Sequence, residues 1–174
     1  MRILALCGSL QSQSSNRELL KLVTTLAPPG VQVVDFEGLR DLPHFDPDLE
    51  ARGEPETVRN WRRAIADSDA LLIASPEYGH SLPGVLKNAI DWVIGSGELE
   101  RKIVAITASV PHAERGRRGL AALRGTLGAV SADVVGGEPI ARGPAFEAEV
   151  KQLLEQLVAR VRAQKRNRTS YGFR

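Results

Sequence analysis

The sequence predicts an α/β protein in which five parallel strands form one sheet with helices on both faces. Short hydrophobic runs alternate with amphipathic helical stretches along the 174 residues. One of the runs is continuously apolar, which is typical of a strand covered on both faces. Strands that alternate with helices form βαβ units, and these units require parallel strands. No repeat, low-complexity linker or change in composition marks a second domain.

The strands are predicted from hydrophobic runs of five to eight residues. They are expected at Ile3–Cys7, Val31–Asp35, Ala70–Ser75, Lys102–Ser109 and Ala129–Val135. The third run is the continuously apolar one. A long loop containing Pro and Asp, around residues 42–48, is expected to follow the second strand.

The helices are predicted from apolar residues at helical spacing and from proline and glycine at their ends. The first three are expected at Arg17–Ala27, at about Glu56–Ala66 and over residues 82–93. A fourth is expected at Gly119–Leu127. The last helix carries an apolar stripe that consists of Val150, Leu153, Leu154, Leu157, Val158 and Val161.

The composition indicates a folded protein of the aqueous phase. The apolar fraction is 43% and the charged fraction 25%, values ordinary for globular proteins. No apolar run approaches the roughly 20 residues that span a bilayer, and no secretory signal pattern is present. The single cysteine, Cys7, excludes an internal disulfide and lies in a predicted buried strand, where packing is its expected role. We therefore expect a cytoplasmic protein without a membrane partner.

The positive net charge of +2 has its origin in the C-terminal segment. Residues 160–174 contain six basic and no acidic residues, and the remaining chain has 17 basic against 21 acidic residues, a net charge of −4. We expect a domain at residues 1–163 and a basic, flexible tail at residues 164–174, with no nucleic acid as partner. A tail attracted to phosphate or membrane surfaces remains the alternative.

The loops after the first, third and fourth strands are expected to carry the function, because open α/β sheets bind ligands beyond the carboxyl ends of their strands. The first loop, Gly8–Asn16, contains four serines and one asparagine before a helix. A helix N-terminus with such neutral donors favours a phosphate group. A Ser/Asn-rich helix cap without ligand is the alternative interpretation. Neither a nucleoside-triphosphate loop nor a dinucleotide-binding glycine pattern is present.

Two segments together resemble the NAD(P)H-dependent FMN reductase family of flavodoxin-like proteins, which includes quinone, chromate and azo-dye reductases. The first combines Gly8-Ser9-Leu10 with Ser14 and Asn16. The second runs from Pro76-Glu77-Tyr78 through Ser81, Pro83 and Gly84 to Leu86-Lys87-Asn88-Ala89-Ile90-Asp91-Trp92. The resemblance implies a flavodoxin-like three-layer sandwich with strand order 2-1-3-4-5.

The resemblance also implies a non-covalently bound FMN and an FMN-dependent NAD(P)H oxidoreductase. Hydride would pass from NADPH or NADH to flavin N5, and electrons then to a quinone, free flavin, chromate or azo acceptor, with no side chain as obligatory acid or base. The residues implied to bind FMN are Ser9, Gln11, Ser14, Ser15 and Asn16 around the phosphate, Pro76, Glu77, Tyr78 and Gly79 beside the flavin, and Ser109 at the far side of the ring. A homodimer or homotetramer is implied as well.

The chain differs from the family pattern at three places. Gln11 stands where a basic residue is common, Gly79 where Asn is common, and residues 109–116 replace a glycine-rich loop. Two other functions stay open: a flavodoxin-type electron carrier with FMN but no dehydrogenase activity, and a binding module without flavin.

Other residues near the predicted site allow two interpretations each. Arg115, Arg117 and Arg118 form a basic cluster that would favour the 2′-phosphate of NADPH or simply face solvent. Trp92 and Val93 would contact another subunit or pack against the sheet. The three histidines, His44, His80 and His112, lie in separate loops and show no metal-ligand spacing, so no metal site is expected.

Overall fold

Five parallel strands form a single sheet in the order β2-β1-β3-β4-β5, in a computed structural model that describes residues 1–171 and the side chains of residues 1–167. This confirms the predicted α/β class and strand order. The strands are β1 (Arg2–Cys7), β2 (Gln32–Phe36), β3 (Ala70–Ala74), β4 (Ile103–Val110) and β5 (Asp133–Ala141). The helices are α1 (Ser15–Leu26), α2 (Pro47–Arg52), α3 (Glu56–Ala66), α4 (Gly84–Asp91), α5 (Arg117–Ala129) and α6 (Phe146–Tyr171), with a 3-10 helix at Gly38–Asp41.

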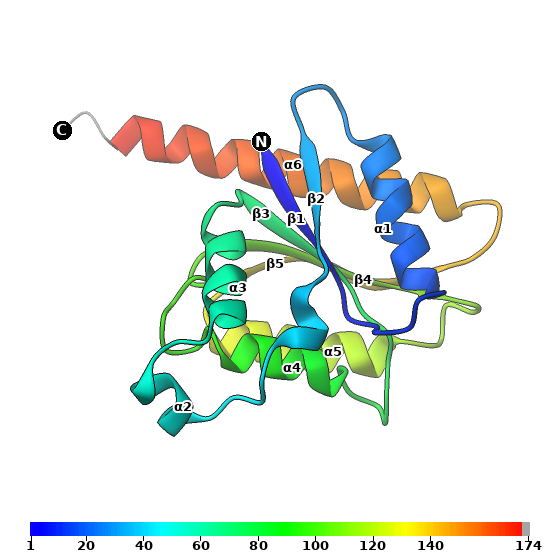
Figure 1. The fold of residues 1–174 in the computed structure, drawn as a ribbon. Helices are drawn as coiled ribbons and strands as arrows, with labels where there is room; N and C mark the ends of the chain where they lie inside the picture. Colours follow the sequence, from blue (N-terminus) through cyan, green and yellow to red (C-terminus); the bar gives the residue numbers. More distant parts are fainter. Residues whose placement is uncertain (172–174) are drawn as a thin grey trace.

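The helices cover the sheet in two layers (Figure 1). Apolar residues of α1 and α6 pack on one face, and those of α3, α4 and α5 pack on the other. Alternate residues of each inner strand enter opposite layers, because successive side chains of a strand point to opposite faces. In β4, for example, Ile103 and Ala105 join the α1/α6 layer, whereas Val104 and Ile106 join the other.

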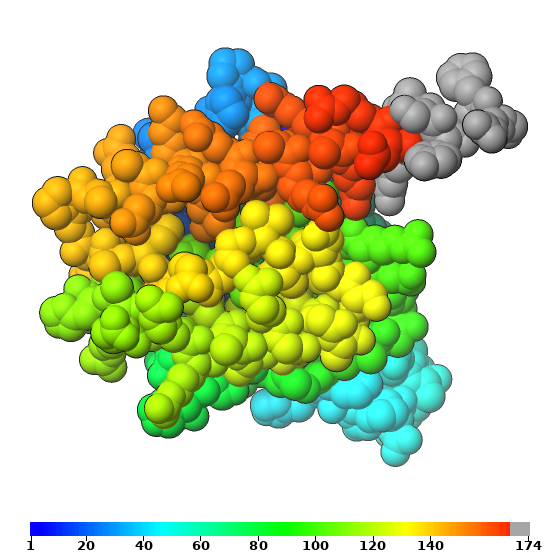
Figure 2. Space-filling model, turned by 180° about the vertical axis from the view of Figure 1, so that it is seen from behind, coloured from blue at the N-terminus to red at the C-terminus, as the bar shows by residue number. Residues whose placement is uncertain are grey.

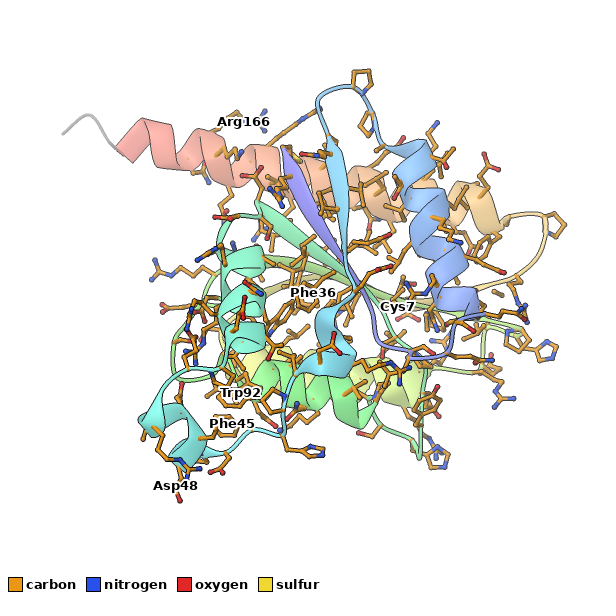
Figure 3. The ribbon with its side chains drawn as sticks, in the orientation of Figure 1. Cys7, Phe36, Phe45, Asp48, Trp92 and Arg166 are labelled. Atoms are coloured by element: carbon orange, nitrogen blue, oxygen red, sulfur yellow. The ribbon has the colours of Figure 1, made fainter. Side chains whose placement is uncertain are left out.

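The central strands β1, β3 and β4 are apolar because both of their faces are covered. All residues of β3 and β4 are buried, and in β1 only Arg2 is exposed. Cys7 is a buried free thiol at the end of β1 (Figure 3), as its place in the strand predicts. Trp92 and Val93 are fully buried, so packing against the core, and not contact with another subunit, accounts for both.

The segment after β2, expected to be a loop, contains two short helices, the 3-10 helix Gly38–Asp41 and α2. Asp46 caps α2 by accepting a hydrogen bond from the Asp48 N–H at 2.9 Å, and Pro47 occupies the first turn. Phe45 contacts Trp92 edge to face, with ring centroids 5.1 Å apart (Figure 3). The Nε1–H of Trp92 donates to the carbonyl oxygen of Pro43 at 2.8 Å. The loop is therefore attached to the end of α4.

The prediction for the fifth strand is wrong in its bounds. It placed the strand at Ala129–Val135, but β5 covers Asp133–Ala141. The preceding residues close the last turn of α5, where the N–H of Ala132 donates to the carbonyl oxygen of Leu127 at 3.1 Å. A bulge between Gly136 and Pro139, where Gly136 and Gly137 both have positive φ, lets the strand continue to its end beside β4.

Helix α6 continues past residue 163, the predicted end of the domain, to Tyr171. Two contacts attach its later turns to the domain: Lys165 Nζ lies 2.7 Å from Asp69 Oδ1, and Gln164 Nε2 donates to the carbonyl oxygen of Arg101 at 3.0 Å. Figure 2 shows α6, in orange and red, running along the molecule above α5 in yellow. Residues 172–174 of the predicted tail lie outside the described residues.

Candidate functional site

A cavity of about 510 Å³ lies at the carboxyl edge of the sheet, where the loops after β1, β3, β4 and β5 meet. Nine of the ten residues predicted to bind the cofactor line it, and Gly79 does not. The nine are Ser9, Gln11, Ser14, Ser15, Asn16, Pro76, Glu77, Tyr78 and Ser109. Its volume falls within the range of about 300–1,000 Å³ that is typical of small-molecule sites.

One wall of the cavity is the start of α1. Ser14 is the N-cap residue, and its Oγ accepts a hydrogen bond from the Asn16 N–H at 3.3 Å. Ser9 Oγ accepts from the Gln11 N–H at 3.2 Å, which shapes the preceding turn. The helix N-terminus adds a partial positive charge and N–H groups without helical partners. This wall consequently offers neutral donors to an anion.

Asn16 joins this wall to the end of β4. Its Oδ1 accepts a hydrogen bond from the backbone N–H of Ser109 at 2.8 Å, and Ser15 Oγ donates to the Ser109 carbonyl oxygen at 3.2 Å. Asn16 is only 3% exposed. The sequence separation exceeds 90 residues for both bonds, so the fold itself brings the first and fourth loops together.

The Ser109 hydroxyl is buried and has no hydrogen-bond partner. Among the side chains that the structure describes, it is the one buried oxygen or nitrogen atom in this condition. Ser109 lies between Ala108 and Val110, which both enter the layer of α3, α4 and α5. By alternation its side chain lies on the face that α1 covers. An unpaired buried hydroxyl is costly, and Ser109 is one of the residues that line the cavity.

The opposite wall is the turn after β3. The N–H of Tyr78 donates to the carbonyl oxygen of Ser81, and the N–H of Ser81 donates back to Tyr78, both at 3.0 Å. Gly79 and His80 both have left-handed backbone conformations, with φ of 55° and 62°. The turn holds the Tyr78 side chain at the mouth of the cavity, where it is 55% exposed. Its ring offers an aromatic surface to a flat ligand.

Glu77 attaches this turn to the start of α5. Its Oε2 accepts a hydrogen bond from the Gly119 N–H at 2.9 Å, and its Oε1 lies 3.2 Å from His80 Nδ1. A Cβ atom on Gly119 would lie 3.0 Å from the Glu77 Cα, so the close approach requires glycine. The Gly119 N–H, followed by His80, lowers the pKa of Glu77 despite partial burial. Glu77 is therefore ionised at neutral pH and is unsuited to donate a proton.

The structure separates the three arginines of the predicted basic cluster. Arg115 lines the cavity. Arg117 is directed to β5, where its Nη1 lies 2.8 Å from Glu138 Oε2, and Arg118 does not line the cavity. Arg142, in the loop after β5, lines the cavity without having been predicted. In the sequence Arg142 is an isolated arginine followed by Gly and Pro, and no sequence pattern there identifies it as a site residue.

The described residues contain no group of three or more His, Cys, Asp and Glu side chains that could hold a metal ion. Of the three histidines, His80 contacts Glu77, and none is among the residues that line the cavity. Within the described part of the chain, no helix is both long and apolar enough to cross a membrane.

A protein-family model and several known proteins match this chain. A family model described as NADPH-dependent FMN reductase matches residues 1–145. The NAD(P)H-dependent FMN reductase PA1204 of Pseudomonas aeruginosa is 38% identical over 121 residues, which cover 70% of this chain and 64% of that protein. A quinone reductase of Pseudomonas putida is 44% identical over 84 residues, 48% of this chain and 45% of its own length. The matches thus span about half to two thirds of these relatives.

A solved structure extends the likeness over nearly the whole fold. FerB, a flavoenzyme NAD(P)H:(acceptor) oxidoreductase from Paracoccus denitrificans, superposes with a TM-score of 0.77 at 26% sequence identity. The superposition covers 91% of this chain and 97% of that one.

Proposed function

The chain belongs to the NADPH-dependent FMN reductase family, and from this premise we propose that it binds FMN in the cavity and transfers electrons from NAD(P)H to a small oxidised acceptor. Quinones are the acceptors that the names of several relatives suggest. Bound FMN would supply the redox chemistry by accepting hydride from a reduced nicotinamide and passing the electrons on.

The unpartnered Ser109 hydroxyl carries the proposal. It lies on the cavity wall beside the start of α1, where Ser14, Ser15 and Asn16 surround a helix N-terminus. A mononucleotide phosphate fits these groups because helix N-termini and hydroxyl donors bind phosphate oxygens. Ser109 would donate to the phosphate or to the adjoining ribityl chain. The residues present therefore fit FMN.

The protein's own contribution is to bind and orient. The turn at Pro76–Ser81 is fixed by its two backbone hydrogen bonds and by Glu77, so it forms a rigid wall for the isoalloxazine ring. Tyr78, exposed at the mouth, would border a second flat molecule that enters from solvent. Rigid donors and an open mouth suit an enzyme in which the nicotinamide and the acceptor occupy one place in turn.

Replacing Ser109 by Ala tests the binding site. The variant should be as stable as the wild type or more stable, because an unpaired buried hydroxyl is removed. Its affinity for FMN should nevertheless fall by about three- to tenfold, because a neutral hydrogen bond contributes roughly 0.5–1.5 kcal/mol. The measurement is a titration of flavin fluorescence together with thermal unfolding. Ser12→Ala is the matched control, since Ser12 is in the same loop but does not line the cavity.

Retention of full FMN affinity in Ser109→Ala would contradict the proposed place of the ligand. The reaction is tested separately, by oxidation of NADPH and NADH with a quinone in the presence of FMN. An electron carrier would bind FMN and show almost no such turnover.

The proposal includes a cytoplasmic location and assembly into a dimer or tetramer. The free, buried thiol of Cys7 is compatible with a reducing compartment. Phe45 and Ile94, which are 38% and 55% exposed, supply apolar surface near the end of α4 for contact with a second copy. Analytical ultracentrifugation would measure the assembly.

A further inference from the structure

Arg142 presents an unpaired positive charge to the cavity. Arg142 is one of the two arginines that line the cavity. Its backbone N–H donates to the carbonyl oxygen of Val110 at 2.9 Å, which fixes the main chain. Its guanidinium group forms no hydrogen bond or ion pair with the residues that the structure describes.

Other cations around the first and fourth loops are bound to protein groups. Arg17 Nη1 lies 3.7 Å from Glu37 Oε1, and Arg40 Nη2 donates to the carbonyl oxygen of Leu10 at 3.0 Å. Arg117 contacts Glu138. Arg115 and Arg142 are therefore the two cations that line the cavity and whose side chains have no partner among the described residues.

The strand register places Arg142 on the side of the sheet where α1 begins. Ala141 pairs with Val110, and the N–H of Arg142 continues the ladder by one bond. Ile140 packs in the α1/α6 layer and Ala141 against the opposite one. Alternation therefore directs residue 142 to the α1 side. Figure 2 shows the segment after β5, in orange, next to the segment after β4, in yellow-green.

Arg115 approaches the cavity from the opposite layer. It belongs to the segment that joins β4 to α5, and α5 packs on the other face of the sheet. The two arginines thus come from segments on different faces of the sheet. Arg142 follows Ile140, which packs in the α1/α6 layer, whereas Arg115 precedes Gly116, which lies against Ala108 and Val110 of the opposite layer.

The α1 side of the cavity needs a positive charge if it is to hold a phosphate dianion. Its lining residues are neutral except for Glu18, which is acidic. The helix N-terminus contributes roughly half an elementary charge, which does not offset both Glu18 and a dianion. Arg142 is placed to supply the missing charge.

We propose that Arg142 is the cationic partner of the FMN phosphate and that it gives the site its preference for FMN over riboflavin. The inference rests on the proposed function. Arginine suits this place because its planar guanidinium can donate two parallel hydrogen bonds to phosphate oxygens. Since Arg142 is exposed, salt should weaken its contribution.

The test compares two ligands that differ only in the phosphate. The dissociation constants of FMN and riboflavin are measured by fluorescence titration for the wild type, Arg142→Ala and Arg142→Lys. Arg142→Ala should weaken FMN binding by about tenfold at low salt, as expected for loss of a charge-assisted contact, and leave riboflavin binding unchanged. Arg142→Lys should recover part of the loss. Arg117→Ala is the control, because Arg117 is paired with Glu138 outside the cavity lining.

The outcomes separate this inference from the proposed function. If the wild type binds neither flavin, both are overturned. If the wild type binds FMN but Arg142→Ala keeps its ratio of FMN to riboflavin affinity, the inference alone is overturned. A raised KM for NADPH with unchanged FMN affinity would also overturn it, because Arg142 would then contact the nicotinamide nucleotide.

Discussion

Asn16 should contribute to both the stability of the fold and the affinity for FMN, and two substitutions separate these contributions. In Asn16→Ala the backbone N–H of Ser109 loses its acceptor, which lies at 2.8 Å in a site that is only 3% exposed. An unsatisfied buried donor costs roughly 1–3 kcal/mol. In a chain of this size 1 kcal/mol corresponds to about 2–4 °C, so the Tm should fall by roughly 2–12 °C.

Asn16→Asp should behave differently. The carboxylate keeps an acceptor for Ser109, and an acidic residue in the first turn of α1 is favourable to the helix. These effects offset part of the cost of burying its charge, so the Tm should fall less than in Asn16→Ala. The substitution also replaces the amide donors by a negative charge facing the ligand. FMN affinity should therefore fall by more than tenfold, further than in Asn16→Ala.

The assay is thermal unfolding by circular dichroism without flavin, followed by fluorescence titration with FMN. Asn60→Ala, an exposed asparagine on α3, is the control and should change the free energy of unfolding by less than about 0.5 kcal/mol. Equal stability of Asn16→Ala and the control would refute the assigned role in the fold. Equal destabilisation by Asn16→Ala and Asn16→Asp would show that the hydrogen bond accepted from the Ser109 N–H does not account for the loss of stability.

Two further predictions concern the junction between Glu77 and Gly119. Gly119→Ala should destabilise the protein by about 1–3 kcal/mol, because the new Cβ would lie 2.9 to 3.1 Å from the Glu77 Cβ, Cα and Cγ atoms. Gly125→Ala in the same helix, where nothing lies within 4 Å of the new Cβ, should be neutral or stabilising. Thermal unfolding of both variants measures the difference, and equal effects would contradict the close contact. Wild type should be more stable than Glu77→Gln at pH 7, and this difference should shrink in acid. A carboxyl group whose folded pKa is lowered stabilises the fold above its unfolded pKa of about 4.3. It loses that contribution as the pH falls through the folded pKa. Urea unfolding between pH 7 and 3 checks this, and a difference that grows toward low pH would show that the sign is wrong.

The general architecture could be predicted because each inner element shows a local pattern that agrees with its place in the fold. Helix α3 lies where the sequence predicts it, at Glu56–Ala66, because Pro55 and a clear apolar stripe define it. Helix α2 escaped prediction although Asp46 and Pro47 form a cap and a first turn. It has six residues and buries none of them, so it lacks the apolar periodicity on which the prediction depended.

The fifth strand shows where local preference and tertiary structure disagree. Gly136 and Gly137 are poor strand formers and directly follow the predicted strand, yet they lie inside β5 at a bulge and have positive φ. Pairing with β4 beyond the bulge overrides the local preference. The same pairing brings Arg142 to the cavity, so the error in the strand and the omission of this residue have one cause.

The charges of the site illustrate what a sequence of this kind leaves undetermined. Arg115, Arg117 and Arg118 look alike in the sequence, but the partner of each decides what it can do. Arg117 is bound to Glu138 and its charge is already compensated, whereas Arg142, more than 20 residues further along the chain, faces the cavity without a partner among the described residues. A charged group can bind a ligand strongly only when no protein group compensates it first. The neutral Gln11 in the phosphate loop therefore does not imply a site without a cation, because in this fold the strand register can supply one from β5.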